Sequence, residues 1–187
     1  MESRTDTAGR DVTGLPGLWD ETDRRVISFT VFGIAQPAGS KRAMPIYRNG
    51  PGGKELARRA NGSPMIAVCD ANPKSRDWKN AVASAAREAY SSELLRGPLK
   101  LTLVFYRPRP KGHFNSQGQL NKSGLACPYP VSKPDVLKLA RGVEDACSGV
   151  LYADDALIVD ESLKKLWGEP ARVEICLESF IGELQHA

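Results

Sequence analysis

Hydrophobic and polar residues alternate in three short segments of the chain, and each segment predicts a β-strand. Residues 26–33 (VISFTVFG) and 99–106 (LKLTLVFY) alternate and are rich in β-branched or aromatic side chains. Residues 171–178 (ARVEICLE) alternate strictly, with three aliphatic side chains on one face. The segment 99–106 becomes wholly apolar towards its end, which favours a strand in the centre of a sheet.

A helical period appears twice. The first helix is predicted from Ser75, its N-cap, to about residues 91–95, with Asp77 in its first turn. The second is predicted over residues 136–147, with Asp135 as its N-cap. One apolar stripe identifies the first helix: Trp78, Ala81, Val82, Ala85 and Ala89.

Three shorter segments, at residues 65–68, 157–159 and 162–167, predict further strands. The order is then strand, helix, strand, helix and strands. It predicts an α+β fold over residues 25–180, with a mixed β-sheet and helices packed on one side.

Four polar segments lack a clear period. Residues 1–24 are predicted as a flexible N-terminal tail, residues 181–187 as a C-terminal tail, and the Gly-rich residues 48–64 as a mobile loop. Residues 107–134 are too long for a passive connector, so we expect them to be either functional or disordered.

The composition indicates one soluble globular domain. Of 187 residues, 41% are hydrophobic and 26% are charged. The apolar runs are too short to span a membrane, and the first residues lack the apolar core of a secretory signal. The four cysteines share no CxxC spacing, which argues against a zinc site and indicates reduced thiols and a cytoplasmic protein.

The net charge of +4 hides an uneven distribution. Residues 94–134 carry seven basic and no acidic side chains, whereas residues 135–187 carry five basic and eleven acidic ones. A basic segment can bind a polyanion, and clustered carboxylates can bind a hard cation. The alternative is two oppositely charged faces that only keep the domain in solution.

The segment from Lys133 to Glu161 groups the carboxylates. Asp135 begins the second helix, Glu144 lies further along it, and Asp154 and Asp155 follow in a turn that leads back towards it. Carboxylates gathered in this way repel one another unless a cation is bound. Beside a basic surface, they suit a metal-dependent phosphodiesterase. The alternative is a helix cap and an ordinary turn.

This segment resembles the RusA family of Holliday junction resolvases, and the resemblance extends more loosely over residues 26–178. The matched residues are Pro134, Asp135, Lys138, Leu139, Arg141, Asp145, Ala146, Gly149, Val150, Tyr152, Asp154, Asp155, Ala156 and Asp160. The resemblance implies a RusA-like fold and a Mg²⁺-dependent nuclease, with Mn²⁺ as a possible substitute. It also implies a bacterial or phage origin.

The resemblance implies roles for individual residues. Asp135 matches the first metal-binding aspartate, Asp155 the essential aspartate of the final pair, and Asp154 its neighbour. Arg141 stands where the family has a catalytic lysine. Because arginine does not readily lose its proton, we expect it to hold a phosphate rather than to act as an acid.

One position departs from the family pattern. The second family aspartate falls at position 137, where this chain has Leu137. Glu144 follows seven residues later, on nearly the same helix face, so we hypothesise that it replaces the missing metal ligand. Asp145 is a less suitable substitute, because it matches a position that the family already uses. The alternatives are an inactive site, or a Glu144 that is only a solvated helix residue.

Basic residues flank the predicted metal site and could line a DNA-binding face. They are Lys41, Arg42, Arg107, Arg109, Lys111, Lys133 and Lys138. The leading hypothesis is an endonuclease that resolves four-way junctions or other branched DNA in recombination and repair. Two symmetric nicks in opposed strands imply a homodimer. We expect neither a membrane nor a small-molecule cofactor to take part. The alternatives are a catalytically impaired junction-binding protein and a non-enzymatic nucleic-acid or phage accessory protein.

Overall fold

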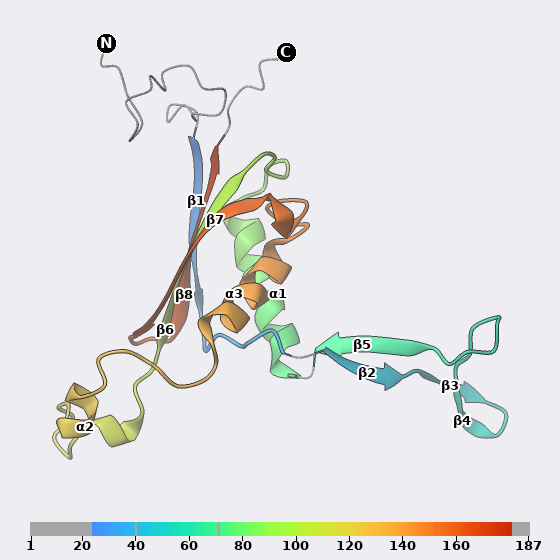
Figure 1. Ribbon diagram of the computed structural model, residues 1–187, viewed down its shortest axis with the longest axis horizontal. Helices are drawn as coiled ribbons and strands as arrows, with labels where there is room; N and C mark the ends of the chain where they lie inside the picture. The colour runs from blue at the N-terminus through green and yellow to red at the C-terminus, as the bar shows by residue number, and fades with distance from the viewer. Residues whose placement is uncertain (1–23, 40, 71, 181–187) are drawn as a thin grey trace, which may run out of the picture.

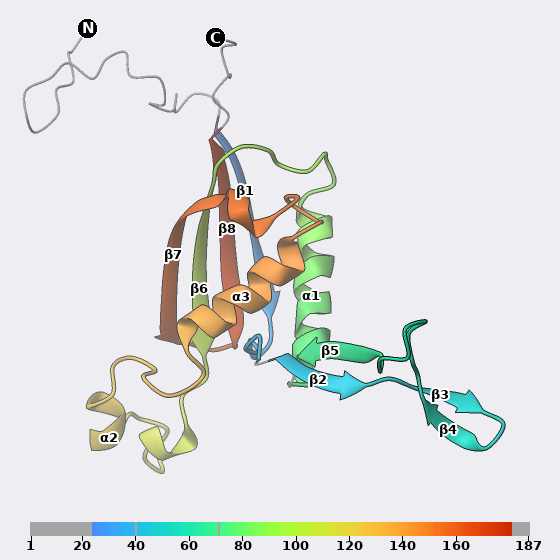
Figure 2. The ribbon, with the colours of Figure 1, turned by 45° about the vertical axis from the view of Figure 1, so that its right-hand side comes forward.

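The computed structural model describes residues 24–39, 41–70 and 72–180, so the predicted tails lie almost wholly outside the described residues. It contains a four-stranded sheet in the order β1, β8, β6, β7. β8 runs antiparallel to both of its neighbours, whereas β6 and β7 are parallel. Two long helices cover one side of this sheet (Figures 1 and 2), which confirms the predicted α+β fold. The strands are β1 (Arg24–Phe32), β6 (Leu99–Arg107), β7 (Ile158–Trp167) and β8 (Arg172–Phe180).

Alternating residues of the central strands build the core. On β6, Leu99, Leu101, Leu103 and Phe105 are at most 1% exposed, as the pattern of this segment predicts. Three residues of β8 are buried beside them: Val173, Ile175 and Leu177. Each side chain of this kind stabilises the fold by about 1.5–3 kcal/mol when it leaves water.

Helices α1 (Lys74–Ala89) and α3 (Val136–Cys147) pack on the sheet and on each other. Trp78, Val82 and Ala86 of α1 lie in the core at intervals of four residues. α3 contributes Leu139 and Val143, both fully buried. An ion pair of 2.7 Å between Lys79 and Asp145 joins the exposed edges of the two helices.

Several local predictions were wrong. α1 ends at Ala89, before the predicted residues 91–95. Ser75 is not the N-cap of α1, because the helix begins at Lys74 and Ser75 is buried in its first turn. The strands predicted at residues 157–159 and 162–167 form the single strand β7, whose pairing with β6 continues through Asp160 and Glu161. A register shift between Leu99 and Lys100 leaves Val159 without a partner on β6, and the ladder continues from Asp160.

Residues 41–70 form a long β-ribbon rather than an irregular loop, and we call this segment the arm. β2 (Lys41–Pro45) pairs with β5 (Ile66–Asp70), and further out β3 (Tyr47–Gly50) pairs with β4 (Gly53–Leu56). Gly53 takes φ +112° after the turn, a conformation that glycine adopts without strain. The arm projects away from the sheet and helices (Figures 1 and 2).

Residues 108–134 form a second projection, which contains η2 (Lys111–His113) and α2 (Lys122–Leu125). The guanidinium of Arg109 donates hydrogen bonds to the carbonyl oxygens of Gly124 (3.0 Å) and Cys127 (3.1 Å). The indole of Trp167 donates to the same Cys127 oxygen at 3.0 Å. These contacts tie the segment to the end of β7, so it is an ordered part of the fold.

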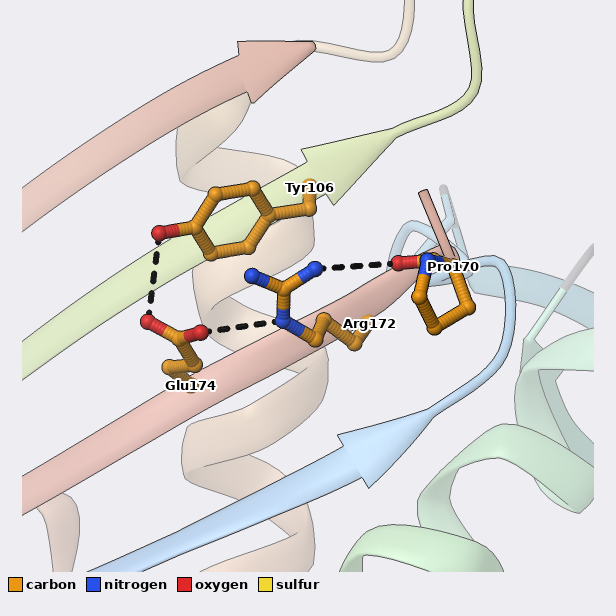
Figure 3. Close-up of polar contacts among 4 residues, drawn as sticks. All are labelled: Tyr106, Pro170, Arg172 and Glu174. Carbon is orange, nitrogen blue, oxygen red and sulfur yellow. Dashed lines mark hydrogen bonds and ion pairs between the residues drawn. The ribbon is translucent and has the colours of Figure 1, made fainter. Parts of the chain in front are cut away.

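The helix-free face of the sheet carries a self-contained polar cluster (Figure 3). The Arg172 guanidinium stacks 3.7 Å from the ring centroid of Tyr106 and donates to Glu174 at 2.9 Å. The Tyr106 hydroxyl donates to the other Glu174 oxygen at 3.2 Å, and Arg172 also donates to the Pro170 carbonyl. Arg172 is therefore engaged within the protein.

None of the helices in the described ranges has the length and hydrophobicity needed to cross a membrane.

Candidate active site

Helix α3 joins two pockets of opposite charge. The first, which we call the cationic pocket, has a volume of about 440 Å³ and lies at the N-terminus of the helix. Its charged lining residues are Arg107, Lys133, Asp135 and Lys138. The second, the acidic pocket, has a volume of about 290 Å³ and lies near the C-terminal end of α3. Its charged lining residues are Glu144, Asp155, Asp160 and Glu161.

The first turn of α3 gives the cationic pocket a positive potential. Asp135 occupies the N-cap position, but its side chain makes no capping hydrogen bond. Its carboxylate instead lies 3.4 Å from the Lys138 ammonium, with both side chains about 60% exposed. The unpaired N–H groups and the helix dipole then favour an anion at this end.

Two further cations border the first turn of α3. The Lys165 ammonium donates to the carbonyl oxygens of Ser132 and Pro134, both at 2.9 Å. Burial lowers the pKa of Lys165, with Arg107 acting in the same direction and Asp135 opposing it. Within the described part of the chain, no hydrogen-bond partner meets the buried Nη1 of Arg107. Arg107 also lines the cationic pocket, where its guanidinium adds to the positive charge.

In the acidic pocket, Glu144 is half-buried and lies opposite Glu161 of β7. Burial raises the pKa of Glu144 to about 7, and its hydrogen bond and charge interaction with Glu161 add to the shift. Asp155 and Asp145 raise the pKa of Glu144 further. Carboxylates this close share a proton or bind a cation, because two neighbouring negative charges repel.

The two potential nucleophiles near the acidic pocket, Cys147 and Tyr152, are not activated. Burial raises the pKa of the Cys147 thiol to about 12, with a contribution from Glu144, so this thiol is neutral near pH 7. Burial also raises the pKa of Tyr152, whose hydroxyl donates to the backbone oxygen of Glu144 at 3.2 Å. These two residues support the end of α3, and the chemistry of the pocket belongs to its carboxylates.

The aspartates of the turn after α3 have separate tasks. The Asp154 carboxylate accepts a hydrogen bond of 2.9 Å from the Ala156 amide and so caps the short helix η3 (Asp155–Leu157). Asp155 instead lines the acidic pocket. Asp145 pairs with Lys79, and Asp160 lies 3.3 Å from Lys100. Of the two turn aspartates, Asp155 is therefore the one placed beside Glu144.

The three predicted metal ligands do not meet in one place within the protomer. Glu144 and Asp155 share the acidic pocket, but Asp135 lies in the cationic pocket. Nine residues of helix separate Asp135 from Glu144, which corresponds to a rise of about 13 Å. Glu144 is likewise about 10 Å along the helix from Leu137, so the two positions lie far apart within the protomer, and the replacement of the missing ligand by Glu144 stays a prediction. Arg141 lies exposed on α3, one turn before Glu144.

The predicted DNA-binding residues are distributed over several places. Arg107, Lys133 and Lys138 share the cationic pocket. Lys41 and Arg42 lie at the base of the arm, and Lys111 lies exposed in the projection 108–134. Arg109 is engaged with backbone oxygens and lies 5.4 Å from the ring centroid of Trp167, so it has a structural task.

The sequence analysis missed Glu161. The signal that could have revealed it is its position in a β-strand that packs beside the acidic end of α3. The sequence predicted two strands with a gap at residues 160–161, so Glu161 was not placed in a strand. Across residues 24–39, 41–70 and 72–180, no three His, Cys, Asp or Glu side chains form a group arranged to hold a metal ion. Mg²⁺ commonly needs only one or two protein carboxylates, with water and phosphate as its other ligands. The pair Glu144 and Glu161 fits that requirement.

Carboxylates next to a cationic surface are the arrangement used by metal-dependent phosphodiesterases. The family model described as endodeoxyribonuclease RusA matches residues 54–178, and the chain belongs to this family. The match confirms the resemblance seen in the sequence and supports endonucleolytic cleavage of Holliday junction DNA. A curated relative, the uncharacterized protein YqaN of Bacillus subtilis (strain 168), is 30% identical over 155 residues. The alignment covers 81% of this chain and 94% of the relative.

Proposed function

We propose that this protein is a magnesium-dependent, structure-selective endonuclease that resolves four-way junctions and related branched DNA in recombination and repair. The observation that carries the proposal is the acidic pocket, which gathers Glu144, Asp155 and Glu161, and in which burial and these neighbours raise the pKa of Glu144 to about 7. A divalent cation relieves the same repulsion without a proton. Mn²⁺ has similar oxygen ligands and is the expected substitute.

The acidic pocket is the proposed cleavage site. A Mg²⁺ bound there would supply Lewis acidity, activating a water and stabilising the leaving oxygen. Glu144 and Glu161 would hold the cation, and Asp155 would add negative charge beside it. Arg141, one helical turn away, would hold the phosphate being cleaved.

The cationic pocket is the proposed binding site for a neighbouring phosphate. Arg107, Lys133 and Lys138 line this pocket at the N-terminus of α3, so they place three positive charges around it. The two pockets lie about 13 Å apart along α3, so they would contact different phosphates of the substrate. Asp135 then orients Lys138 rather than the metal. A homodimer with one such site per subunit would supply the two symmetric nicks.

A synthetic mobile four-way junction tests this proposal directly. We expect paired symmetric nicks in Mg²⁺ and none in EDTA, with Mn²⁺ restoring cleavage. Asp155→Asn should abolish the nicks while it leaves junction binding in place, measured by a mobility-shift assay. Nicks of equal rate in EDTA, or in the Asp155→Asn variant, contradict the proposed chemistry.

Leu137 favours a second candidate function, a protein that binds junctions but cuts them poorly. Leu137 is 67% exposed at the start of α3, where the family pattern has an aspartate. Leu137→Asp would place a second carboxylate near Asp135 and separates the two candidates. If the acidic pocket is the cleavage site, this variant cleaves no faster than the unmodified chain. A large gain in cleavage would favour the impaired protein, and a chain that binds no junction would favour a non-enzymatic accessory role.

A further inference from the structure

We propose that the arm, residues 41–70, is a DNA-binding ribbon that enters a groove of one duplex of the substrate. This inference rests on the proposed function but concerns a different part of the molecule from the two pockets. It assigns a partner, double-helical DNA, to an element that the protein itself leaves uncovered.

The arm holds together by backbone hydrogen bonds rather than by a core. Between its two hairpin sections, Ile46 donates to Met65 at 2.9 Å, Ala57 to Ile46 at 2.8 Å, and Met65 to Ala57 at 2.8 Å. Ala57 is its only buried hydrophobic residue among those described. A two-stranded ribbon of this kind is marginally stable alone, so a bound partner would add to its stability.

The exposed side chains of the arm combine positive charge with apolar surface. The arm has six basic residues, Lys41, Arg42, Arg48, Lys54, Arg58 and Arg59, against the two acidic residues Glu55 and Asp70. Four large apolar side chains are about half exposed or more: Met44 (46%), Tyr47 (57%), Ile66 (51%) and Val68 (63%). Cations bind phosphates, while apolar groups contact sugars and base edges in a groove.

The shape of the arm suits this partner. A two-stranded ribbon fits the major groove of B-DNA, which is about 12 Å wide. At its base, a cleft of about 700 Å³ separates Lys41 and Val68 from Arg76 and Lys79 of α1. Asn72 lines both this cleft and the cationic pocket. DNA held by the arm can therefore continue into the cationic pocket.

Charge also decides between DNA and a second copy of the chain. Two arms packed together would place cations opposite cations, and the repulsion would oppose the burial of Ile66 and Val68. A duplex carries one negative charge per ~1.7 Å of its axis and has the complementary sign. The arm therefore fits DNA better than it fits itself.

A pair of charge reversals at the tip of the arm tests the inference. Arg48→Glu/Lys54→Glu is compared with Arg25→Glu/Arg87→Glu, two exposed residues of β1 and α1 outside the arm. Both variants change the net charge equally. Fluorescence anisotropy in Ca²⁺, on the full chain, measures binding to a four-way junction and to plain duplex over a range of salt. We expect the arm variant to bind at least ~10-fold more weakly and its salt slope to fall by about 2, while the control changes little.

The outcomes are distinct. If the unmodified chain binds no junction, the proposed function fails. If it binds and the arm variant binds equally well, only the role of the arm fails. Ile66→Ser/Val68→Ser tests the other partner by sedimentation. A dimer that becomes a monomer in this variant, with DNA affinity unchanged, overturns the inference in favour of self-association, whereas weaker DNA binding with the oligomeric state unchanged supports it.

Discussion

The two ends of α3 differ in charge although a single helix carries both. At the N-terminal end, Pro134 and Asp135 lie beside Lys165 of β7, and at the other end Glu144 lies beside Glu161 of the same strand. Lys165 and Glu161 are four residues apart, or about 13 Å of strand, which equals the rise of nine helical residues from Asp135 to Glu144. The packing of α3 beside β7 therefore brings a cation to the N-terminal end of the helix and a carboxylate to its other end. A site of each kind arises from segments that both carry mixed charges.

The difference between the ends indicates a division of labour. At the cationic end, Lys138 pairs with Asp135 and Lys165 donates to backbone oxygens, so these side chains are already held in place. A phosphate can therefore bind there without a large rearrangement. The acidic end places carboxylates together at a cost, which appears as the raised pKa of Glu144. Such a cost is typical of a functional site rather than of a structural one.

The largest expected effect comes from loosening the helix that holds both ends. Leu139 is fully buried on α3, so Leu139→Ala should lower the free energy of unfolding by about 2–5 kcal/mol. Leu137, two residues earlier and 67% exposed, gives the matched control. Leu137→Ala should change the free energy of unfolding by less than about 0.5 kcal/mol. Urea denaturation measures both. Equal losses would show that α3 does not pack as described.

The next largest effect is expected on junction cleavage, when a carboxylate of the acidic pocket is removed. Glu161→Gln removes the partner of Glu144 and should slow junction cleavage at least ~100-fold, since losing a metal ligand costs more than losing its outer support. Asp160→Asn is the matched control: it lines the same pocket but pairs with Lys100, and we expect a much smaller change. Junction affinity should stay within about threefold in both variants. Single-turnover cleavage rates in Mg²⁺ provide the comparison, and similar rates for the two would rule out Glu161 as a ligand.

A smaller effect is expected at the cationic end. Lys133→Ala/Lys138→Ala should weaken junction binding about 10-fold and lower the salt slope by about 2, because two phosphate contacts are lost. Lys164→Ala/Arg87→Ala, on the exposed surface of β7 and α1, supplies the control. Mobility-shift titrations at several salt concentrations measure the slope. An unchanged slope would mean that phosphates bind elsewhere.

The smallest effect is on the pH dependence of stability. The pKa of Glu144 rises from its ordinary value of 4.5 to about 7 in the fold. Between these values the folded chain holds more protons than the unfolded chain, so the contribution of Glu144 to stability falls as the pH rises from about 4.5 through about 7. In EDTA we expect the melting temperature of the unmodified protein to fall by a few degrees more, from pH 5.5 to pH 8, than that of Glu144→Gln. Thermal melts followed by circular dichroism measure this, and parallel curves would contradict a raised pKa.

At pH 8, Mg²⁺ should recover part of the lost stability in the unmodified protein, because it binds the ionised carboxylates of the folded state. Glu144→Gln should gain much less from Mg²⁺. The difference between the two proteins, with and without the metal, then reports binding at the acidic end without relying on cleavage.

Regular patterns made much of the fold predictable. The strict alternation along β8 and the apolar end of β6 identified these strands, and the bounds of α3 were predicted correctly as residues 136–147. The pattern failed where partners decide the structure. β7 contains the polar pair Asp160 and Glu161, which reads as a break but continues the ladder with β6. The arm lacks a buried face and so lacks the alternation that would have predicted its strands.

The candidate site shows the same division. The sequence alone determined that a basic segment passes into an acidic one at Lys133-Pro134-Asp135, and that Glu144 and Asp155 carry chemistry worth testing. Only the tertiary structure decided that Asp135 and Glu144 belong to different pockets, and that Glu161 is the partner of Glu144. The physical reason is that helical periodicity reports which face a residue occupies but says nothing of the strand that packs on that face. The rise along the helix and the register of β7 together decide which charges meet.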